Sequence, residues 1–420
     1  MTDDDGPTFR PLDPDEYDAF AAVADYAFSP TDGPPGASDD DEEPPERLAE
    51  RFGVFDDELV SICAHYDFTA RLRGEWVPLA GLAAVATPPE HRRRGYVRHL
   101  VEASLARWRG DSPLAALWPF DRGYYRQFGW ATANTVAEYT CPPEALAFAR
   151  GRATGGARRV DADEWTALQE AHETHAERRT LTLRRDERWW RKKVFRTDAD
   201  RADRPHVYVW ERDGDVRGHV AYTFSDPGEK HTSHRLDVAD LAFADDDAHL
   251  GLLGLLADHD SQADEVALTG ASTELLDRVP DPSAVDCEVR AGPMVRVVDV
   301  ADALSACPYP EDATADLTLR VADDTAPWND GVLELRVADG EGACTRIESE
   351  SGGADAETDA GEPDQDADVT VDIGTLSQLV VGYRAPAALA RTGELDADDA
   401  TVERLAALFP AESVFLRDFF

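Results

Sequence analysis

The stretch that decides the fold is GLAAVATPPEHRRRGYVRHLVEASLARW, residues 81–108. It begins as an apolar strand and ends as a helix with apolar residues at helical spacing. Between the two lies a turn in which Arg92, Arg93 and Arg94 are followed by Gly95. A helix N-terminus offers unpaired backbone N–H groups and a partial positive charge, and glycine lets a ligand approach the backbone. The pattern predicts a site for a pyrophosphate, with a solvated basic turn as the alternative.

The flanking segments predict more strands and helices. We expect a first unit over 1–150, a second over 151–291 and a third over 292–420. The second repeats the strand–turn–helix order of 78–110 without its arginines. In the first unit we expect strands at 8–12 and 113–120, helices at 14–28, 96–110 and 121–130, a hairpin turning at Arg73-Gly74, and a Pro/Gly/acid loop at 29–46.

Charge is the strongest compositional signal. The 420 residues include 85 acidic and 42 basic ones, a net charge of −43, and 9% are aromatic. Self-repulsion of this size destabilises a compact chain, and molar salt removes it because the Debye length falls to about 3 Å at 1 M. We interpret the composition as that of a folded protein from the cytoplasm of an extreme halophile. The same charge argues against nucleic acid and anionic membranes as partners.

The cysteines and histidines predict no metal site. The five cysteines are scattered and form no CxxC, so a disulfide framework or zinc site is not expected, and a reducing cytoplasm fits. The two histidines of HTSH, residues 231–234, lack a cysteine cluster around them. No apolar run of about 18 residues predicts a membrane span, and the start MTDDDGP is unlike a signal peptide. The basic, Trp-containing run at 178–196 is interpreted as ion-paired surface or a subunit contact.

The arginine turn resembles the acetyl-CoA loop of the GNAT acetyltransferases, Q/R-x-x-G-x-G/A. This chain has Arg92-Arg93-Arg94-Gly95-Tyr96-Val97, and Val97 stands where the family has a small residue. The longer stretch from HRRRG to GYYRQFGW is similar to the Eis (enhanced intracellular survival) branch. That branch combines HRRRG with a later Y-x-x-F-G and a C-terminal phenylalanine. The resemblance covers nearly the whole chain.

The resemblance implies a fold class and a cofactor site. The fold is α+β or α/β: two GNAT-like domains, each a mixed sheet flanked by helices, and a sterol-carrier-protein-like C-terminal domain. The co-substrate is acetyl-CoA, with main-chain groups beside its pantetheine and arginines at its phosphates. The residues that the resemblance assigns to it are Val85, Ala86, Thr87, Arg92, Arg93, Arg94, Gly95, Tyr96, Val97, Arg98, Phe120 and Asp121.

The last residues, SVFLRDFF (413–420), raise the question of how the reaction moves its protons. Acetyl transfer to an amine needs a base for the ammonium and an acid for the departing thiolate. The resemblance implies that the α-carboxylate of Phe420 is the base and that Tyr125 is the acid, with Tyr124 as a packing residue. A phenol, with a pKa of about 10, is well matched to a thiol. The alternatives are a hydrophobic plug for the ending and a structural role for both tyrosines.

The expected function is acetyl-CoA-dependent N-acetylation of a primary amine on a small molecule, aminoglycoside- or polyamine-like. The first alternative acceptor is a protein N-terminus or a lysine. The second alternative is a non-catalytic ligand- or lipid-binding protein with the third domain as its working part. The resemblance implies a homo-oligomer, a hexamer in the branch, and the acceptor pocket is expected to draw on residues 14–47.

Overall fold

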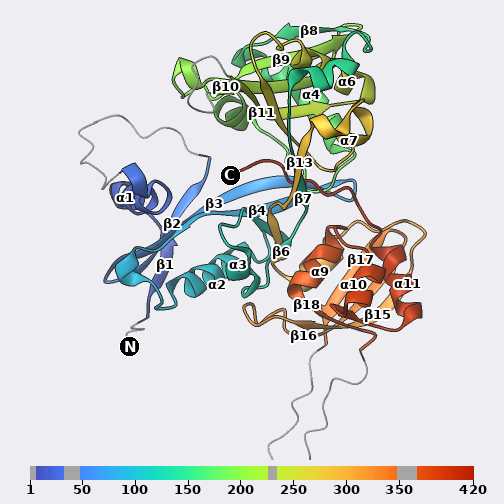
Figure 1. Cartoon of the computed structure of the whole chain (residues 1–420). Coiled ribbons are helices and arrows are strands. Elements are labelled where there is room, and N and C mark those ends of the chain that lie inside the picture. Colours follow the sequence, from blue (N-terminus) through green and yellow to red (C-terminus); the bar gives the residue numbers. More distant parts are fainter. Residues whose placement is uncertain (1–5, 33–47, 226–233, 348–366) are drawn as a thin grey trace, which may run out of the picture. The chain divides into compact units, whose positions relative to one another are not determined.

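The computed structural model describes residues 6–32, 48–225, 234–347 and 367–420 (Figure 1). The chain forms two compact units. The first holds Met1–Ala133, Pro293–Glu412 and Asp418–Phe420, and the second holds Asn134–Gly292 and Ser413–Arg417. Most of the loop expected at 29–46, and His231 of the HTSH pair, lie outside the described residues.

The first unit is built on a seven-stranded sheet with the order β1-β2-β3-β4-β5-β14-β6. β4 runs parallel to β5, and the other neighbours pair antiparallel. The strands are β1 (Thr8–Pro11), β2 (Glu50–Asp56), β3 (Glu58–Leu72), β4 (Glu75–Ala86), β5 (Leu114–Leu117), β6 (Ala131–Thr132) and β14 (Met294–Val297).

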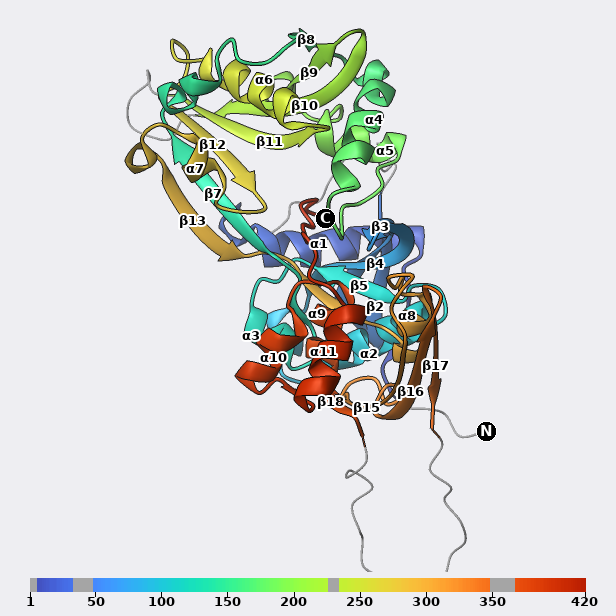
Figure 2. The same ribbon diagram turned by 90° about the vertical axis from the view of Figure 1, so that its right-hand side faces the viewer.

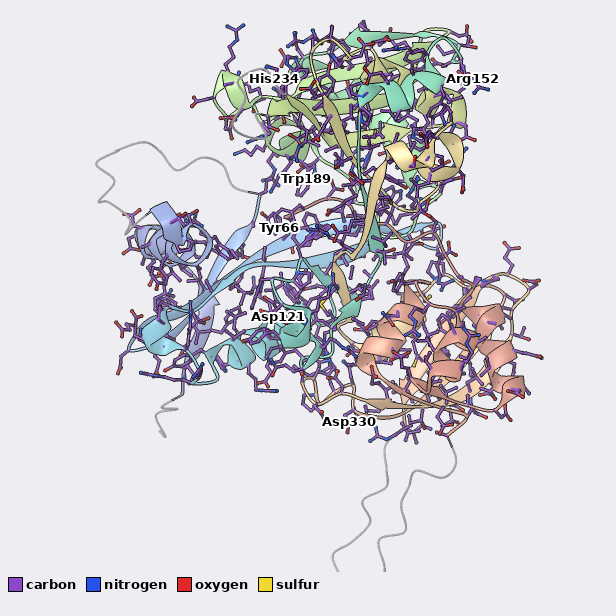
Figure 3. The ribbon with its side chains drawn as sticks, in the orientation of Figure 1. Tyr66, Asp121, Arg152, Trp189, His234 and Asp330 are labelled. Atoms are coloured by element: carbon purple, nitrogen blue, oxygen red, sulfur yellow. The ribbon has the colours of Figure 1, made fainter. Side chains whose placement is uncertain are left out.

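Two helices cover opposite faces of this sheet, α1 (Tyr17–Phe28) and α2 (Tyr96–Trp108). Side chains alternate along a strand, so Ile62 of β3 packs in the cluster under α1, while its neighbour Cys63 packs in the cluster under α2. A third helix, α3 (Arg122–Arg126), follows β5 and begins at Asp121, whose carboxylate accepts a hydrogen bond from the Tyr124 N–H (Figure 3).

β4 separates from β5 towards its C-terminal end. The two strands pair only from Leu79 to Leu82 on β4, and β5 ends at Leu117. On its other edge β4 carries one extra residue, because Ala84 and Val85 lie opposite the single residue Cys63 of β3. This bulge, with Ala84 at φ +50°, bends the strand and leaves its end without a partner on the β5 side.

The remainder of the first unit is a five-stranded sheet with helices on one side (Figures 1 and 2). Its strand order is β17-β16-β15-β18-β19. The Ser377 hydroxyl of α9 accepts a hydrogen bond from the Val297 N–H of β14, which joins this part to the seven-stranded sheet. The elements are α8 (Val300–Ala306), β15 (Ala315–Ala322), β16 (Gly331–Ala338), β17 (Glu341–Arg346), β18 (Val369–Asp372), α9 (Ile373–Val380), α10 (Pro386–Thr392), β19 (Leu395–Asp396) and α11 (Asp399–Leu408).

The second unit is built on another seven-stranded sheet, with the order β13-β7-β12-β11-β10-β9-β8. α4 packs on the face of β10 that carries His219, where His172 of α4 lies 6.4 Å from the His219 ring. Val220, on the other face of β10, joins the apolar cluster under α6. The main elements are β7 (Thr135–Cys141), β8 (Gly156–Arg159), α4 (Trp165–Ala176), α5 (Glu187–Trp189), β9 (His206–Arg212), β10 (Asp215–Ser225), β11 (Arg235–Phe243), α6 (Asp246–Ala257), β12 (Glu265–Gly270), α7 (Leu275–Arg278) and β13 (Asp286–Ala291).

The expected elements of the first unit occur with shifted ends. The hairpin turns at Arg73-Gly74, and both residues have positive φ angles, +45° and +93°. The helix expected from residue 14 starts at Tyr17, because Asp13 and Glu16 first form a capping box around a single 3-10 turn. The strand expected over 113–120 is shorter, Leu114–Leu117, since β4 leaves it there.

The domain borders near residues 150 and 291 stay a prediction. The two seven-stranded sheets show where the chain passes from one sheet to the other. β7 comes directly after β6 of the first sheet in the chain but pairs with β12 and β13 in the second. β14 follows the second sheet in the chain but inserts between β5 and β6 of the first. The chain therefore changes from one sheet to the other at 133–134 and again at 292–293.

Candidate active site

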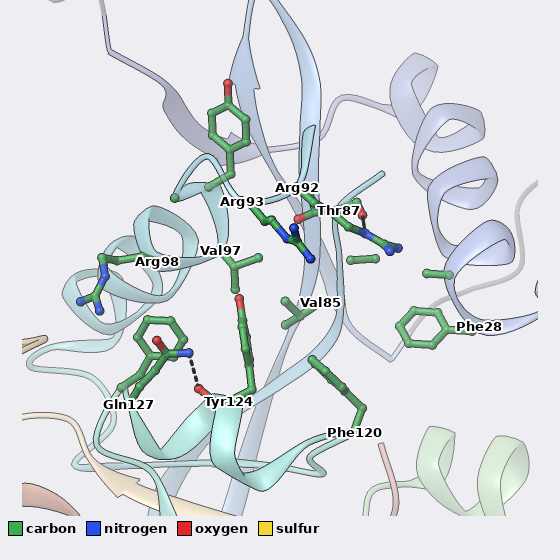
Figure 4. A pocket seen from close by; sticks show the side chains of 15 residues that line it. Phe28, Val85, Thr87, Arg92, Arg93, Val97, Arg98, Phe120, Tyr124 and Gln127 are labelled. Carbon is green, nitrogen blue, oxygen red and sulfur yellow. Dashed lines mark hydrogen bonds between the residues drawn. The ribbon is translucent and has the colours of Figure 1, made fainter. Parts of the chain in front are cut away.

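A cavity of about 680 Å³ lies in the first unit, at the end of β4 (Figure 4). Its wall is formed by the end of α1, the bulged end of β4, the arginine turn, the start of α2 and the segment that includes α3. The lining residues are Ala27, Phe28, Val85, Ala86, Thr87, Arg92, Arg93, Gly95, Tyr96, Val97, Arg98, Phe120, Tyr124, Gln127 and Phe128. None of them is acidic, in a chain with 85 acidic residues.

The arginine turn is held in shape by its own side chains. Arg92 donates from Nε to the carbonyl oxygen of Thr87 at 2.9 Å, and Arg94 donates to that of Glu90 at 2.9 Å. Arg93 has a positive φ of +61°, and its side chain lies with Arg92 over one end of the cavity, opposite Phe120 and Tyr124 (Figure 4). Two arginines thus brace the turn, and Arg93 presents its charge to the cavity.

The N-terminus of α2 opens onto this cavity. Its N-cap residue is Gly95, with φ +87°, and no side chain caps the helix there. A Cβ at Gly95 would meet nothing within 4 Å, so the space in front of the first turn is open. Arg98, on the first turn, pairs with Glu102 at 3.5 Å and lies 5.1 Å from the ring centre of Phe128. Free N–H groups, a helix dipole and arginines together suit a phosphate.

On the opposite side of the cavity, α3 carries two consecutive tyrosines with different surroundings. Tyr124 lines the cavity, and its carbonyl oxygen accepts a hydrogen bond from Gln127 at 2.9 Å (Figure 4). Tyr125 is 3% exposed and packs in the core cluster under α2, with its ring 5.5 Å from that of Phe120. Successive helical residues point about 100° apart, so one tyrosine faces the cavity and the other faces the core.

Both phenols are held in the protonated form. Burial raises the pKa of Tyr124 above its usual value of about 10, and the charge of Arg98 opposes the shift only in part. Burial raises the pKa of Tyr125 further, helped by Tyr124 and Cys63. A phenol that stays neutral can donate a proton, so either tyrosine has the chemistry of a general acid.

The last three residues belong to the same unit as this cavity. The ring of Phe420 is 8% exposed and packs against Phe68 and Tyr66 of β3, at 4.8 and 5.4 Å between ring centres. Trp118, the residue after β5, donates from Nε1 to the Asp418 carbonyl oxygen at 2.9 Å. The chain end therefore lies beside the place where β4 and β5 separate.

The structure brings together ten of the fourteen predicted site residues in one cavity wall. Arg94, Asp121, Tyr125 and Phe420 are not part of that wall. Tyr124, expected to be a packing residue, packs its ring against the core cluster under α2 and also lines the cavity. Sequence reasoning assigned no site role to Ala27, Phe28, Gln127 or Phe128, although Phe128 belongs to the Y-x-x-F-G pattern and the first two fall in the 14–47 segment on which the acceptor pocket was expected to draw.

Comparisons with known proteins match both sheets and the C-terminal part. A family model described as an acetyltransferase (GNAT) domain matches residues 8–133, a second of the same description matches 181–297, and a sterol carrier protein domain model matches 300–417. An uncharacterized N-acetyltransferase of Streptomyces avermitilis is 29% identical over 308 residues, which is 70% of this chain and 74% of that one.

Some of the similar proteins carry the Eis name. The N-acetyltransferase Eis of Mycobacterium tuberculosis is 42% identical over 86 residues, a match that spans 20% of this chain and 21% of Eis. The crystal structure of Eis1 from Mycobacterium abscessus has a TM-score of 0.75 and 25% identity, and covers 99% of this chain and 100% of that one.

The two sheets, the open helix N-terminus and the matched domains define a GNAT acetyltransferase, which is an acyltransferase enzyme. Its fold implies acetyl-CoA as the co-substrate. Within that class the chain belongs to the Eis-like N-acetyltransferases, with two GNAT domains and a sterol-carrier-type domain after them, and the predicted fold class is confirmed.

Two further observations concern the described part of the chain. None of its helices is long and apolar enough to cross a membrane. Within the same residues, no group of three or more His, Cys, Asp or Glu side chains could hold a metal ion. The basic run at 178–196 has buried tryptophans, Trp189 and Trp190, and its charges pair with carboxylates, as in the 2.7 Å contact of Arg191 with Glu187.

Proposed function

We propose that this enzyme transfers the acetyl group of acetyl-CoA to a primary amine of a small molecule, aminoglycoside- or polyamine-like. The observation that carries the proposal is the cavity in front of α2, which combines an uncapped helix N-terminus with arginines in a chain of net charge −43. A pyrophosphate is repelled by an acidic surface, so its site needs local positive charge such as these arginines and this helix N-terminus. The names of the relatives, N-acetyltransferases, support an amine as the acceptor.

In this proposal the phosphates bind at the start of α2 and at Arg93. The pantetheine lies along the end of β4, where Val85 to Thr87 have no strand on the β5 side. Its amides then bond the main chain as an added strand does. The thioester falls between this strand end and α3, within reach of the tyrosines.

We propose Tyr125 as the general acid and the Phe420 carboxylate as the general base. The amine loses a proton to the carboxylate as it attacks the thioester carbon, and the C–S bond breaks as the phenol protonates the thiolate. The raised pKa of Tyr125 keeps the phenol protonated before the reaction, and it also makes this phenol a weaker acid than a free tyrosine side chain. Packing of the Phe420 ring on β3 supports a fixed position for the chain end.

The first experiment measures thiol release from acetyl-CoA in molar KCl, with small amines, polyamines, aminoglycosides and lysine peptides as acceptors. The native chain is compared with a form that has two glycines added after Phe420. We expect the native form to turn over with the small amines, and the extended form to bind acetyl-CoA equally but to react slowly.

Other outcomes separate the alternatives. Equal activity of the two forms would place the base elsewhere and leave the phenylalanine ending as packing. Turnover with the peptides alone would assign a protein acceptor. If neither form turns over, acetyl-CoA binding is measured by titration. A chain that binds no acetyl-CoA cannot be an acetyltransferase, whereas a chain that binds it lacks only the right acceptor.

A further inference from the structure

The two seven-stranded sheets share a local irregularity. β4 pairs with β5 up to Leu82 and carries its extra residue at Ala84. β11 pairs in parallel with β12 up to Asp237 and carries its extra residue at Ala239, between the partners of Ala221 and Tyr222. In both strands the extra residue comes two positions after the last pairing with the parallel neighbour. The second sheet therefore has a separated strand end of the same design as the one proposed to take acetyl-CoA.

The two separated ends differ in what they contain. The first borders a cavity of about 680 Å³, whereas the cavity at the second measures about 90 Å³ and is lined in part by Phe415 and Arg417. The start of α6 is also closed, because the Asp245 side chain accepts a hydrogen bond from the Ala248 N–H. Asp245 also pairs with Arg212 at 2.7 Å. Its carboxylate therefore occupies the position at the start of α6 where an anionic ligand would bind.

Main-chain hydrogen bonds hold residues 413–417 in the second unit. Thr180 donates to the Ser413 carbonyl oxygen and accepts from the Phe415 N–H, both at 2.9 Å, as adjacent parallel strands do. The Leu416 N–H donates to the Asn134 side-chain oxygen at 3.0 Å, and the Leu416 side chain is fully buried.

Arg417 binds the irregular part of β11 itself. Its guanidinium donates to the carbonyl oxygens of Ala239 and Leu241, the two residues that flank Asp240. Asp240 is 4% exposed and contacts Arg417 at 2.6 Å. Asp240 also binds Arg185 at 2.6 Å and His219 at 2.9 Å. Burial opposes its negative charge, but the neighbouring arginines outweigh burial and hold the pKa of the carboxyl well below its usual range.

We propose that the separated end of the second sheet is a binding site for residues 413–417 of the chain itself, and that Arg417 is a positioning residue for acetyl transfer. The site takes a peptide segment where the first sheet takes acetyl-CoA. Only Asp418 and Phe419 separate Arg417 from Phe420, so freedom at Arg417 becomes freedom at the terminal carboxylate. The positioning role rests on the proposed function of Phe420, whereas the binding site does not.

The test uses the full chain with Arg417→Ala and Arg417→Lys. Asp240 keeps Arg185 and His219 as partners in both variants, so no buried charge is left alone. Arg404→Ala is the matched control, because Arg404 lies on α11 and forms a long contact, 3.9 Å, with Asp368. Hydrogen exchange of residues 413–417 is followed by mass spectrometry, and kcat and the Kd for acetyl-CoA are measured in the same buffer.

For Arg417→Ala we expect exchange at Phe415 and Leu416 to rise at least about tenfold while β3 and β4 stay protected. We expect kcat to fall about 10- to 100-fold with the acetyl-CoA Kd unchanged, and Arg417→Lys to recover part of both. Exchange at the level of the Arg404→Ala control would overturn the binding site. Faster exchange with an unchanged kcat would overturn the positioning role and keep the binding site. The glycine extension tests the Phe420 carboxylate separately, so the two failures are distinguishable.

Discussion

Tyr124 and Tyr125 show how much one position along a short helix changes the chemistry of the same side chain. α3 has only five residues, from Arg122 to Arg126, and its start is fixed by the Asp121 cap. That cap sets the rotation of the helix, so Tyr125 enters the core and Tyr124 borders the cavity. The Y-x-x-F-G pattern locates this pair in the sequence, but it carries no information on the cap that orients it.

The tyrosines give the first prediction. Tyr125→Phe removes the proposed acid, and we expect kcat to fall about 100-fold or more, within the usual range for loss of an acid–base group. Tyr124→Phe is the matched control, with a smaller effect on kcat. Steady-state kinetics of both variants with a good amine acceptor measure the difference. A larger loss of kcat in Tyr124→Phe would assign the acid to the residue that lines the cavity.

The pH dependence of the same step is the second prediction. The folded-state pKa of Tyr125 is raised, so the phenol loses its proton only above its ordinary value of about 10. We therefore expect no fall in kcat from loss of this proton between about pH 8 and 10, the range where an unperturbed phenol begins to ionise. A kcat–pH profile checks it. An alkaline limb in that range that disappears in Tyr125→Phe would contradict the raised pKa.

Arg93 and Arg94 provide the third prediction, because they are neighbours with different contacts. Arg93 lines the cavity, whereas Arg94 bonds the Glu90 carbonyl oxygen and is not part of the lining. We expect Arg93→Ala to raise the acetyl-CoA Kd about tenfold or more, as loss of a hydrogen bond to a charged group does. Arg94→Ala should change the Kd less, and titration calorimetry measures both. Equal effects would indicate that the turn's shape matters more than either charge.

At the scale of the element, the end of β4 brings the site together. It offers the strand edge proposed for the co-substrate, and Gly81, in the neighbouring stretch of β4 that pairs with β5, lies under the Phe420 ring. A Cβ at Gly81 would come within 2.7 Å of Phe68 and 2.9 Å of Phe420, so these rings would have to move. The absence of a side chain at this position is what lets the terminal ring pack on the sheet.

Gly81→Ala is the fourth prediction. The added methyl displaces the Phe420 ring, so we expect kcat to fall while the acetyl-CoA Kd stays within about threefold, and overpacking lowers the free energy of unfolding by about 1–3 kcal/mol. Gly6→Ala, where a Cβ meets nothing within 4 Å, is the control. Kinetics and thermal unfolding measure the two effects. Unchanged kcat in a destabilised Gly81→Ala would separate the ring's packing from catalysis.

The elements also show what the sequence could and could not predict. The β3–β4 hairpin and α2 were predictable, because a Gly turn and helical spacing are local signals. The arginine turn between strand and helix was predictable for the same reason, and its use as an anion site stays a prediction. The place of β14 was not, since its partner strands β5 and β6 lie more than 160 residues earlier in the chain. The bulge at Ala84 carries no distinctive residue, because alanine occurs throughout this strand.

At the scale of the whole molecule, charge is the dominant property, and it gives the fifth prediction. A net charge of −43 repels itself at low salt, and screening grows as the Debye length falls from about 10 Å at 0.1 M to about 3 Å at 1 M. We expect the midpoint of thermal unfolding to rise steadily from 0.1 M to molar KCl. Circular dichroism melts along a KCl series measure it. A midpoint independent of salt would contradict the halophilic interpretation.

The late position of β14 in the chain has a consequence for synthesis on the ribosome. The first sheet has a gap between β5 and β6 until Met294–Val297 has been made. At about 10 residues per second, an interval of some 15 seconds separates β6 from its last neighbour. All strands of the second sheet are complete by Ala291. The sheet encoded later can therefore be completed first, while β5 and β6 of the earlier sheet still have unpaired edges. The negative charge shared by neighbouring nascent chains repels them, and this helps to prevent these edges from pairing between chains.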